Sequence, residues 1–154
     1  KYLDDIVEVL KELEQKHEFN FIVISDKAPS FELKSLVFVP WKKDTEIEDL
    51  MKLHIGLMPL TQEKWAEGKC GFKAIQYMSL GIPAIVSPVG VNSIIIKDGN
   101  NGFIATTSKD WYTSIEKLIT NQDLRVKFGT NAITQIQENY SVESTKEKFL
   151  ALFS

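Results

Sequence analysis

The residue types best suited to chemistry lie in one glycine-rich loop that leads into a helix. Gly68 and Gly71 punctuate the loop, and a lysine stands on either side of the second glycine, Lys69 and Lys73. A helix that begins at such a loop leaves backbone N–H groups unpaired, and its dipole adds partial positive charge, so an anion such as phosphate fits there. The residues of this predicted anion site are Gly68, Lys69, Cys70, Gly71, Phe72 and Lys73. The alternative interpretation, solvated lysines beside turn glycines, stays open.

Three further loops contain residues that suit a nucleotide ligand. The candidates in these loops are Asp26, Lys27, Pro40, Trp41, Gly90, Val91 and Asn92. Gly90, Val91 and Asn92 open a second short helix, where they are expected to face a diphosphate or a sugar. The indole of Trp41 is a candidate to contact a base, with packing at the rim as the alternative. Asp26 and Lys27 either line the nucleotide pocket or belong to a solvated loop.

The elements that would position these loops alternate along the chain. Apolar runs predict strands at 19–25, 36–40, 54–59, 83–87 and 103–105, and helical spacing predicts helices at 2–13, 45–53, 72–80, 94–97 and in three segments after 108. This alternation predicts an α/β fold, a Rossmann-like doubly wound parallel sheet with helices on both faces and a C-terminal run of helices. Ile47, Leu50 and Met51 are expected to face inward from their helix.

The carboxyl ends of parallel strands meet at one edge, where ligands bind in such sheets. That rule is expected to bring the candidate loops together at this edge. A domain of this type that begins with a helix is expected to have its first strand upstream of Lys1.

Composition limits the classes of function. The chain has 154 residues, enough for one domain with a real core, and a net charge of −3 without a run of like charges, which argues against nucleic acid as a partner. A single cysteine excludes an internal disulfide and, weakly, fits a reducing, cytoplasmic compartment. His17 and His54 are isolated from other ligand residues, so no metal site is expected. No apolar run approaches the length of a membrane span.

One combination of motifs resembles a known family. Leu80–Ser87 reads Leu-Gly-Ile-Pro-Ala-Ile-Val-Ser, Val-Gly follows, and Asp98–Phe103 reads Asp-Gly-Asn-Asn-Gly-Phe. The chain is similar in these places to the C-terminal donor-binding domain of family-four, or group 1, retaining glycosyltransferases of the GT-B fold. The resemblance implies that residues 1–154 form a single domain, the nucleotide-sugar-binding half of a two-domain enzyme. It also implies a nucleoside-diphosphate sugar as substrate, with no cofactor and no bound metal.

The site residues of that family match this sequence only in part. The family typically has two glutamates with seven residues between them, and the matching positions here are Gly68 and Gln76. Gln76 is still able to bond a ribose hydroxyl as a neutral partner. Glu67 lies one residue early and would be the sugar-contacting, catalytic carboxylate only if the loop is shifted. The family's diphosphate-binding Arg/Lys pair would precede Lys1.

Taken together, the residues and the resemblance predict a hexosyltransferase domain of polysaccharide biosynthesis that acts with retention. The acceptor, a glycan, a lipid or another molecule, would bind to an N-terminal domain, so this chain alone is expected to be inactive. Peripheral association of the full protein with a membrane is left open. Two alternatives stay open, a nucleotide-sugar epimerase of the same fold and a non-catalytic nucleotide- or glycan-binding module. Gly68 and Gln76 keep the second alternative open, and a binding screen of nucleoside diphosphates bears on both.

Overall fold

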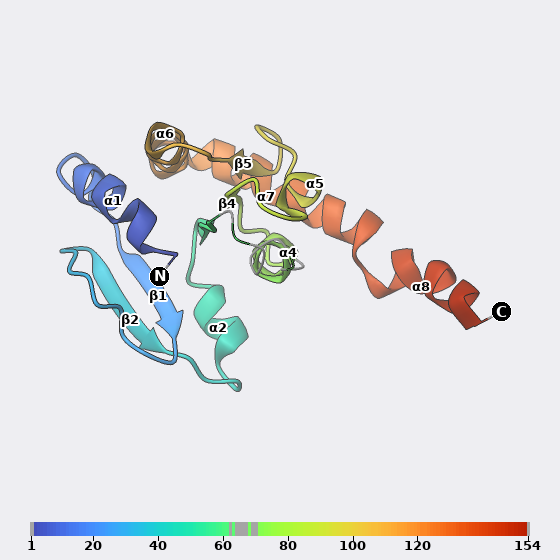
Figure 1. The fold of residues 1–154 in the computed structure, drawn as a ribbon. Helices are drawn as coiled ribbons and strands as arrows, with labels where there is room; N and C mark the ends of the chain where they lie inside the picture. The colour runs from blue at the N-terminus through green and yellow to red at the C-terminus, as the bar shows by residue number, and fades with distance from the viewer. Residues whose placement is uncertain (1, 62, 64–67, 69–70, 154) are drawn as a thin grey trace.

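The computed structural model describes residues 2–61, 63, 68 and 71–153. Helices and parallel strands are interspersed along the first two thirds of the chain, with β1 followed directly by β2, and helices follow each other to its end (Figure 1). The elements are η1 Asp4–Ile6, α1 Val7–Leu13, β1 Phe21–Ser25, β2 Leu36–Pro40, α2 Glu46–Leu50, β3 Gly56–Met58, α4 Phe72–Ser79, β4 Ala84–Val86, α5 Asn92–Ile95, β5 Gly102–Ile104, α6 Ser108–Thr120, α7 Gln122–Asn139, α8 Val142–Leu150 and η2 Ala151–Phe153. The predicted parallel α/β fold and the helical C-terminal run are confirmed.

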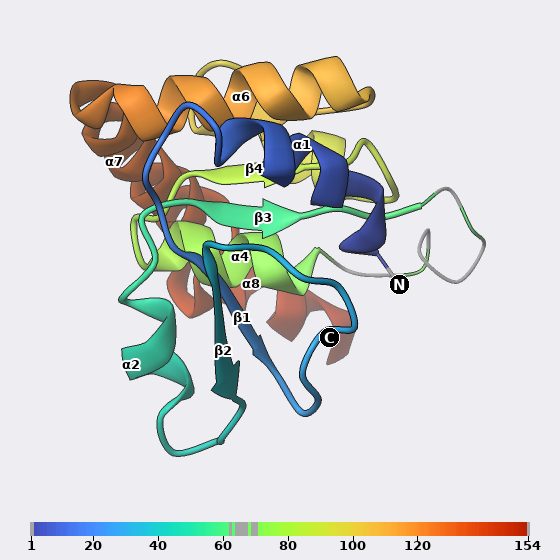
Figure 2. The same cartoon turned by 90° about the vertical axis from the view of Figure 1, so that its left-hand side faces the viewer.

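The described strands form two parallel sheets, a difference from the single continuous sheet that the alternation suggested. β1 pairs with β2, and β3, β4 and β5 pair in that order. Figure 2 shows that the two sheets are turned relative to each other. No described strand lies between β1 and β3 to supply backbone hydrogen bonds. The β1–β2 pair is therefore held by side chains, since Phe21 and Val23 pack into the cluster around α1 and α6.

Strand β4 shows why this sheet needs helices on both faces. Its three residues are fully buried, with Ala84 and Val86 in the cluster formed with α4 and α7. Ile85, between them, belongs to the opposite cluster with α1 and α6. Successive side chains of a strand point to opposite faces, so an unbroken apolar run is stable only when both faces are covered. The sheet thereby sets the beginnings of α4 and α5 at its carboxyl edge.

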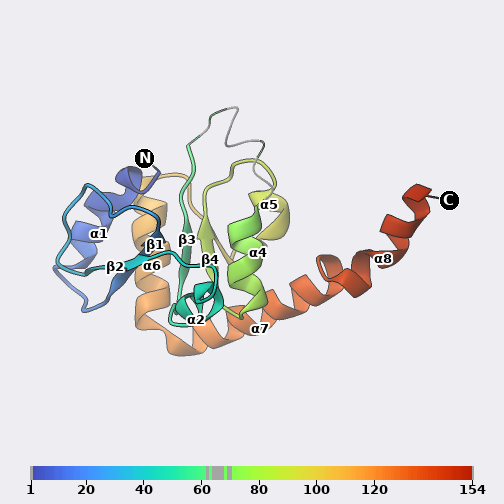
Figure 3. The same cartoon turned by 90° about the horizontal axis from the view of Figure 1, so that it is seen from below.

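Two of the helices differ from expectation or extend from the body. In α2 Asp49 and Leu50 are buried, whereas Ile47 and Met51, the residue that follows the helix, are 53% and 68% exposed, so the predicted inward orientation of Ile47 and Met51 was wrong. The five-residue α2 offers too short an apolar stripe to bury three positions at once. Helix α8 extends away from the sheets, as Figure 3 shows, and carries the exposed side chain of Phe149. Within the described residues, no helix combines the length and apolar character needed to cross a membrane.

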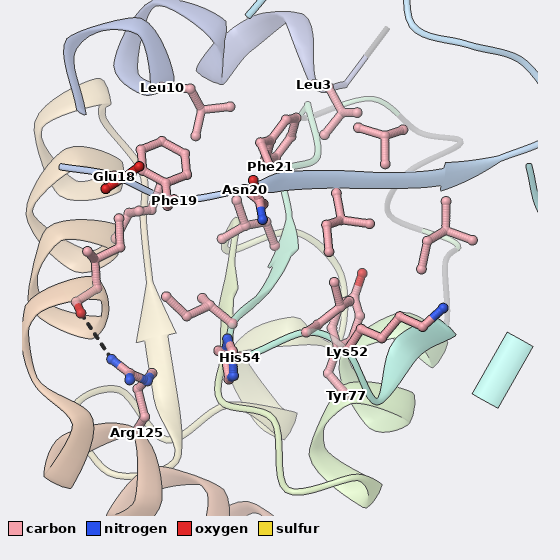
Figure 4. A pocket seen from close by; sticks show the side chains of 18 residues that line it. Leu3, Leu10, Glu18, Phe19, Asn20, Phe21, Lys52, His54, Tyr77 and Arg125 are labelled. Atoms are coloured by element: carbon pink, nitrogen blue, oxygen red, sulfur yellow. Dashed lines mark hydrogen bonds between the residues drawn. The ribbon is translucent and has the colours of Figure 1, made fainter. Parts of the chain in front are cut away.

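A cavity of about 430 Å³ separates the two sheets. Residues of β1 line one side of it, and the segment leading into β3, with Tyr77 of α4, lines another (Figure 4). Arg125 at its rim donates to the carbonyl of Ile119 at 3.0 Å and so caps the end of α6. None of the described candidate residues for nucleotide binding lines this cavity.

The phenol of Tyr77 gives a prediction about alkaline stability. Burial raises the pKa of Tyr77 from 10.0 to about 12, because the ionised form is poorly solvated in its position against β3. Above pH 10 the unfolded chain releases this proton while the folded chain keeps it. The free energy of unfolding should then fall by roughly 2–3 kcal/mol as the pH rises to about 12. Below pH 10 the contribution of Tyr77 to the free energy of unfolding does not change with pH.

The variant Tyr77→Phe separates this ionisation from those of other groups. The free energy of unfolding of the parent and the variant is measured with urea from about pH 8 to about pH 11. Up to about pH 10 the two values should change in parallel. Above pH 10 the parent should lose stability faster, because only the parent has this phenol. Parallel losses over the whole range would show that Tyr77 ionises as freely in the folded protein as in the unfolded chain.

Candidate functional site

The start of α4 is fixed by a left-handed glycine. Gly71 caps α4 with φ 67° and ψ 18°, and its carbonyl accepts the first helical bond from Ile75 N at 3.1 Å. A Cβ atom at Gly71 would lie 2.4 Å from Ile95 Cδ1 and 3.2 Å from Val91 Cγ2. This close approach places the beginning of α4 directly against the beginning of α5. The structure thus brings together two loops that the sequence analysis predicted separately.

Hydrogen bonds of two of its own side chains hold the loop before α5 in place. Asn92 is 1% exposed and its amide donates to the carbonyl of Ser87 at 3.1 Å. The hydroxyl of Ser87 in turn accepts from Leu60 N at 3.0 Å, which ties the loop to the end of β3. Asn92 therefore positions the loop, while Gly90 is exposed and Val91 half-buried beside Gly71. Ser87 was not among the predicted site residues, and only the packing of the two strands gives it this role.

A second group of side chains meets one turn further along α4. Lys73 Nζ lies 3.2 Å from Glu46 Oε1 and donates to Gln76 Oε1 at 2.9 Å. Gln76 Nε2 donates to the same Glu46 oxygen at 3.3 Å. The nearby side chain of Trp41 also contributes to lowering the pKa of the Glu46 carboxylate. Lys73 and Gln76 were predicted on one helix and Trp41 in a separate loop, and Glu46 of α2 contacts both Lys73 and Gln76.

Glu46 was missed in the sequence analysis. It stands two residues before Glu48 in the same helix, and nothing in the sequence distinguishes the two carboxylates. The side chains of Glu46 and Lys73 are 22% and 49% exposed. Hydrogen bonds from Gln76 and then Lys73 lower the pKa of Glu46, so the carboxylate is ionised at neutral pH. The group therefore presents one anion, one cation and one amide close to an exposed indole.

The loops after β1 and β2 lie at the carboxyl edge of the other sheet. Trp41 N donates to Ser25 O at 3.1 Å and so joins the ends of the two strands, next to Pro40. Asp26 and Lys27 are exposed, and the Lys27 carbonyl accepts from Ser25 Oγ at 2.8 Å. Among the hydrogen bonds of the described residues, none connects the side chains of this pair with α4 or α5. The rotation of one sheet relative to the other separates Asp26 and Lys27 from the junction between α4 and α5.

Gly68 is the one residue of the predicted loop segment 67–70 among the described residues. Glu67, Lys69 and Cys70 lie outside the described residues, and their roles stay predictions. Gly68 is an exposed turn residue. Nearby, Thr61 Oγ1 is buried and has no hydrogen-bond partner within the described part of the chain. An unpaired buried hydroxyl is costly, which makes Thr61 an additional candidate to bond a ligand at this edge. Among the described residues, no three His, Cys, Asp or Glu side chains gather as metal ligands would.

Comparison with known proteins identifies a family and several solved structures that are similar to this chain. The family described as Glycosyl transferases group 1 matches residues 1–135. The curated proteins gave no match. Among solved structures, the C-terminal domain of a group 1 family protein (LpcC) from Francisella tularensis is similar with a TM-score of 0.59 and 22% identity, over 71% of this chain and 55% of that one.

Two longer proteins are similar over nearly the whole chain. HepE from Anabaena, in complex with UDP and glucose, gives a TM-score of 0.75 and 16% identity, over 97% of this chain and 44% of that one. A TarM variant from S. aureus, in complex with Fondaparinux, alpha-GlcNAc-glycerol and UDP, gives 0.76 and 21%, over 100% of this chain and 33% of that one. At these identities the likeness shows the fold. The chain spans a third to about half of the length of these relatives.

Proposed function

The chain belongs to the glycosyl transferases group 1 family, and on that premise we propose that it is the donor-binding half of a sugar transferase. The donor is a nucleoside-diphosphate sugar, and the reaction moves a hexosyl group to a glycan, a lipid or another acceptor with retention. UDP is bound in the solved HepE and TarM complexes, which makes UDP the first probe to use. The structure's contribution to the chemistry is positioning and charge stabilisation of the leaving diphosphate.

The observation that carries this proposal is the packing of Gly71 against Val91 and Ile95. It sets the unpaired N–H groups at the start of α4 beside the braced loop that opens α5. An anion at the start of α4 accepts bonds from these N–H groups and gains from the helix dipole. Lys73, in the first turn of α4, adds a positive charge within reach of the same place. The diphosphate of the donor is proposed to bind there, with Lys69 and Glu67 of the preceding loop beside it.

The acceptor is proposed to bind to an N-terminal domain of a longer, cytoplasmic protein, so the 154-residue chain alone is expected to transfer no sugar. The cavity between the sheets supports the related expectation of a strand upstream of Lys1. β1 has β2 on one side and β3 has β4, and apolar side chains from both strands line the space between them. Because β1 and β3 each have one edge without a described strand partner, we expect the upstream strand to pair at these edges.

Removal of the two lysines tests the diphosphate site. We expect Lys69→Ala/Lys73→Ala to weaken UDP binding to the full-length protein by about tenfold or more, because charge-assisted hydrogen bonds contribute roughly 1.5–3 kcal/mol when well formed. The free energy of unfolding should change little, since the Lys73 side chain is half exposed and its ion pair with Glu46 lies near the surface. Calorimetric titration with UDP measures the first effect and urea unfolding the second.

A matched control removes the same net charge elsewhere. Lys109→Ala/Lys127→Ala changes two exposed lysines of α6 and α7, so it should leave the affinity for UDP unchanged. Parent-like UDP binding by the Lys69→Ala/Lys73→Ala protein would place the diphosphate elsewhere. A full-length protein that binds UDP but transfers sugar to no glycan or lipid acceptor would favour the alternative of a non-catalytic binding module.

A further inference from the structure

We propose that Glu46 of α2 competes with the diphosphate of the donor for the ammonium group of Lys73, so that donor binding breaks the contact between α2 and α4. The inference rests on the proposed function and adds to it an autoinhibitory contact that sets the affinity. Three observations carry it: the direction in which the Lys73 side chain points, the charge and orientation of Glu46, and the few bonds that hold α2 in place.

The side chain of Lys73 points away from the proposed diphosphate site. Lys73 lies in the first turn of α4, yet its Nζ donates to Gln76 Oε1 at 2.9 Å and lies 3.2 Å from Glu46 Oε1. Gln76 follows Lys73 by three residues, which is about 4.5 Å along the axis toward the C-terminal end of the helix. The N–H groups that would bind a phosphate lie at the opposite end, beside Gly71. To bond a phosphate there, the Lys73 side chain turns back and leaves Glu46.

The Glu46 carboxylate is charged and already oriented toward Lys73. Hydrogen bonds from Gln76 and then Lys73 lower the pKa of Glu46, so the group is an anion at neutral pH. Gln76 Nε2 donates to the same Oε1 atom at 3.3 Å, which holds the carboxylate beside the ammonium. Before a donor binds, the charge of Lys73 is therefore balanced from within the protein. A contact that the free protein makes and the bound protein loses is subtracted from the free energy of binding.

Helix α2 has few other bonds to keep it in place. Among the described residues, the hydrogen bonds between side chains of α2 and α4 both end on Glu46 Oε1. The side-chain bonds of Asp49 stay within residues 45–52, and Leu50 is the one buried apolar side chain of the helix. When Lys73 moves to a diphosphate, α2 thus loses its polar connection to α4. Because coupling of this kind is reciprocal, a change that removes the connection favours the diphosphate.

The first test measures the affinity of the full-length protein for UDP and for inorganic pyrophosphate. Calorimetry should show that Glu46→Gln tightens the binding of both ligands by about three- to fivefold, the scale expected for an ion pair whose lysine is half exposed. In a Lys73→Ala background the same change should have no effect, because the ammonium for which the two anions compete is gone. Pyrophosphate has no nucleoside, so its gain reports on the phosphate site alone.

Hydrogen exchange of the full-length protein tests the release of α2. Saturating pyrophosphate should speed the exchange of backbone amides in residues 46–51 of the parent, because Lys73 then leaves Glu46. In Glu46→Gln these amides should exchange at the faster rate with or without pyrophosphate. Unchanged or slower exchange in the parent on addition of pyrophosphate would show that α2 stays attached to α4, and would overturn the inference.

Controls separate this inference from a general effect of charge and from the proposed function. Glu48→Gln removes the same charge from an exposed position of α2 and should change neither affinity nor exchange. If Lys73→Ala weakens pyrophosphate binding but Glu46→Gln does not tighten it, the inference alone is overturned. Equal gains from Glu46→Gln with and without Lys73 would also overturn it, since the carboxylate would then act by simple repulsion. A parent that binds neither ligand, or a Lys73→Ala protein that binds both as the parent does, would overturn the proposed diphosphate site and this inference with it.

Discussion

Replacement of Gly71 by alanine is expected to lower the free energy of unfolding by about 2–4 kcal/mol and to weaken UDP binding by more than about tenfold. Two physical causes add up at this position. The backbone has φ 67°, a left-handed conformation that costs a residue with a Cβ about 1–2 kcal/mol. The new Cβ would also lie 2.4 Å from Ile95 Cδ1, and Ile95 is only 2% exposed, so its side chain has little room to move.

The matched control for Gly71→Ala is Gly99→Ala. Gly99 has a nearly identical φ of 71°, but a Cβ there would meet nothing within 4 Å. Gly99→Ala should therefore show the backbone cost alone, about 1–2 kcal/mol, with unchanged UDP affinity. Urea unfolding and calorimetry on both variants give the difference, which measures the contact between α4 and α5. Equal losses in the two variants, with UDP affinity retained in both, would show that this contact does not shape the site.

Replacement of Gly129 by alanine is expected to destabilise the fold although helix propensity favours the change. Gly129 lies in the interior of α7, where alanine is about 1 kcal/mol better than glycine on propensity alone. However, a Cβ at Gly129 would lie 2.2 Å from the Gly81 carbonyl oxygen, a backbone atom in the turn after α4. A backbone contact is not relieved by a change of rotamer, and overpacking typically costs 1–3 kcal/mol or more. We expect a net loss of about 2 kcal/mol.

The measurement for Gly129→Ala is thermal and urea unfolding beside Gln137→Ala. Gln137 is an exposed residue of the same helix, so its change should stay within about 0.5 kcal/mol. For a domain of this size a loss of 2 kcal/mol lowers Tm by roughly 4–8 °C. A Gly129→Ala protein as stable as the parent, or more so, would mean that propensity outweighs packing and that α7 does not press against the turn at Gly81.

The sequence by itself determined the kind of elements and their order. The apolar run at 83–87 predicted a strand, and in the structure Ala84–Val86 is a strand buried on both faces, where its alternating side chains meet helices on either side. Glycine and proline marked the ends of the elements, and Gly81 adopts the left-handed conformation expected after α4, with φ 71°. The family resemblance rests on motifs that contain these glycines and prolines, and it is confirmed by the match of residues 1–135. These features depend on local spacing, which a sequence records directly.

Only the tertiary structure decided which residues meet. The split into two sheets moved Asp26 and Lys27 away from the α4–α5 junction, and the exposure of Ile47 and Met51 on α2 followed from the short helix. The same placement of α2 brought Glu46 to Lys73 and Gln76, 27 and 30 residues further along the chain. Such a contact produces no periodic pattern in the sequence, because hydrogen bonds between residues far apart in the chain depend on how whole elements pack. For that reason a sequence pattern located the glycine-rich loop, and packing alone supplied the carboxylate beside it.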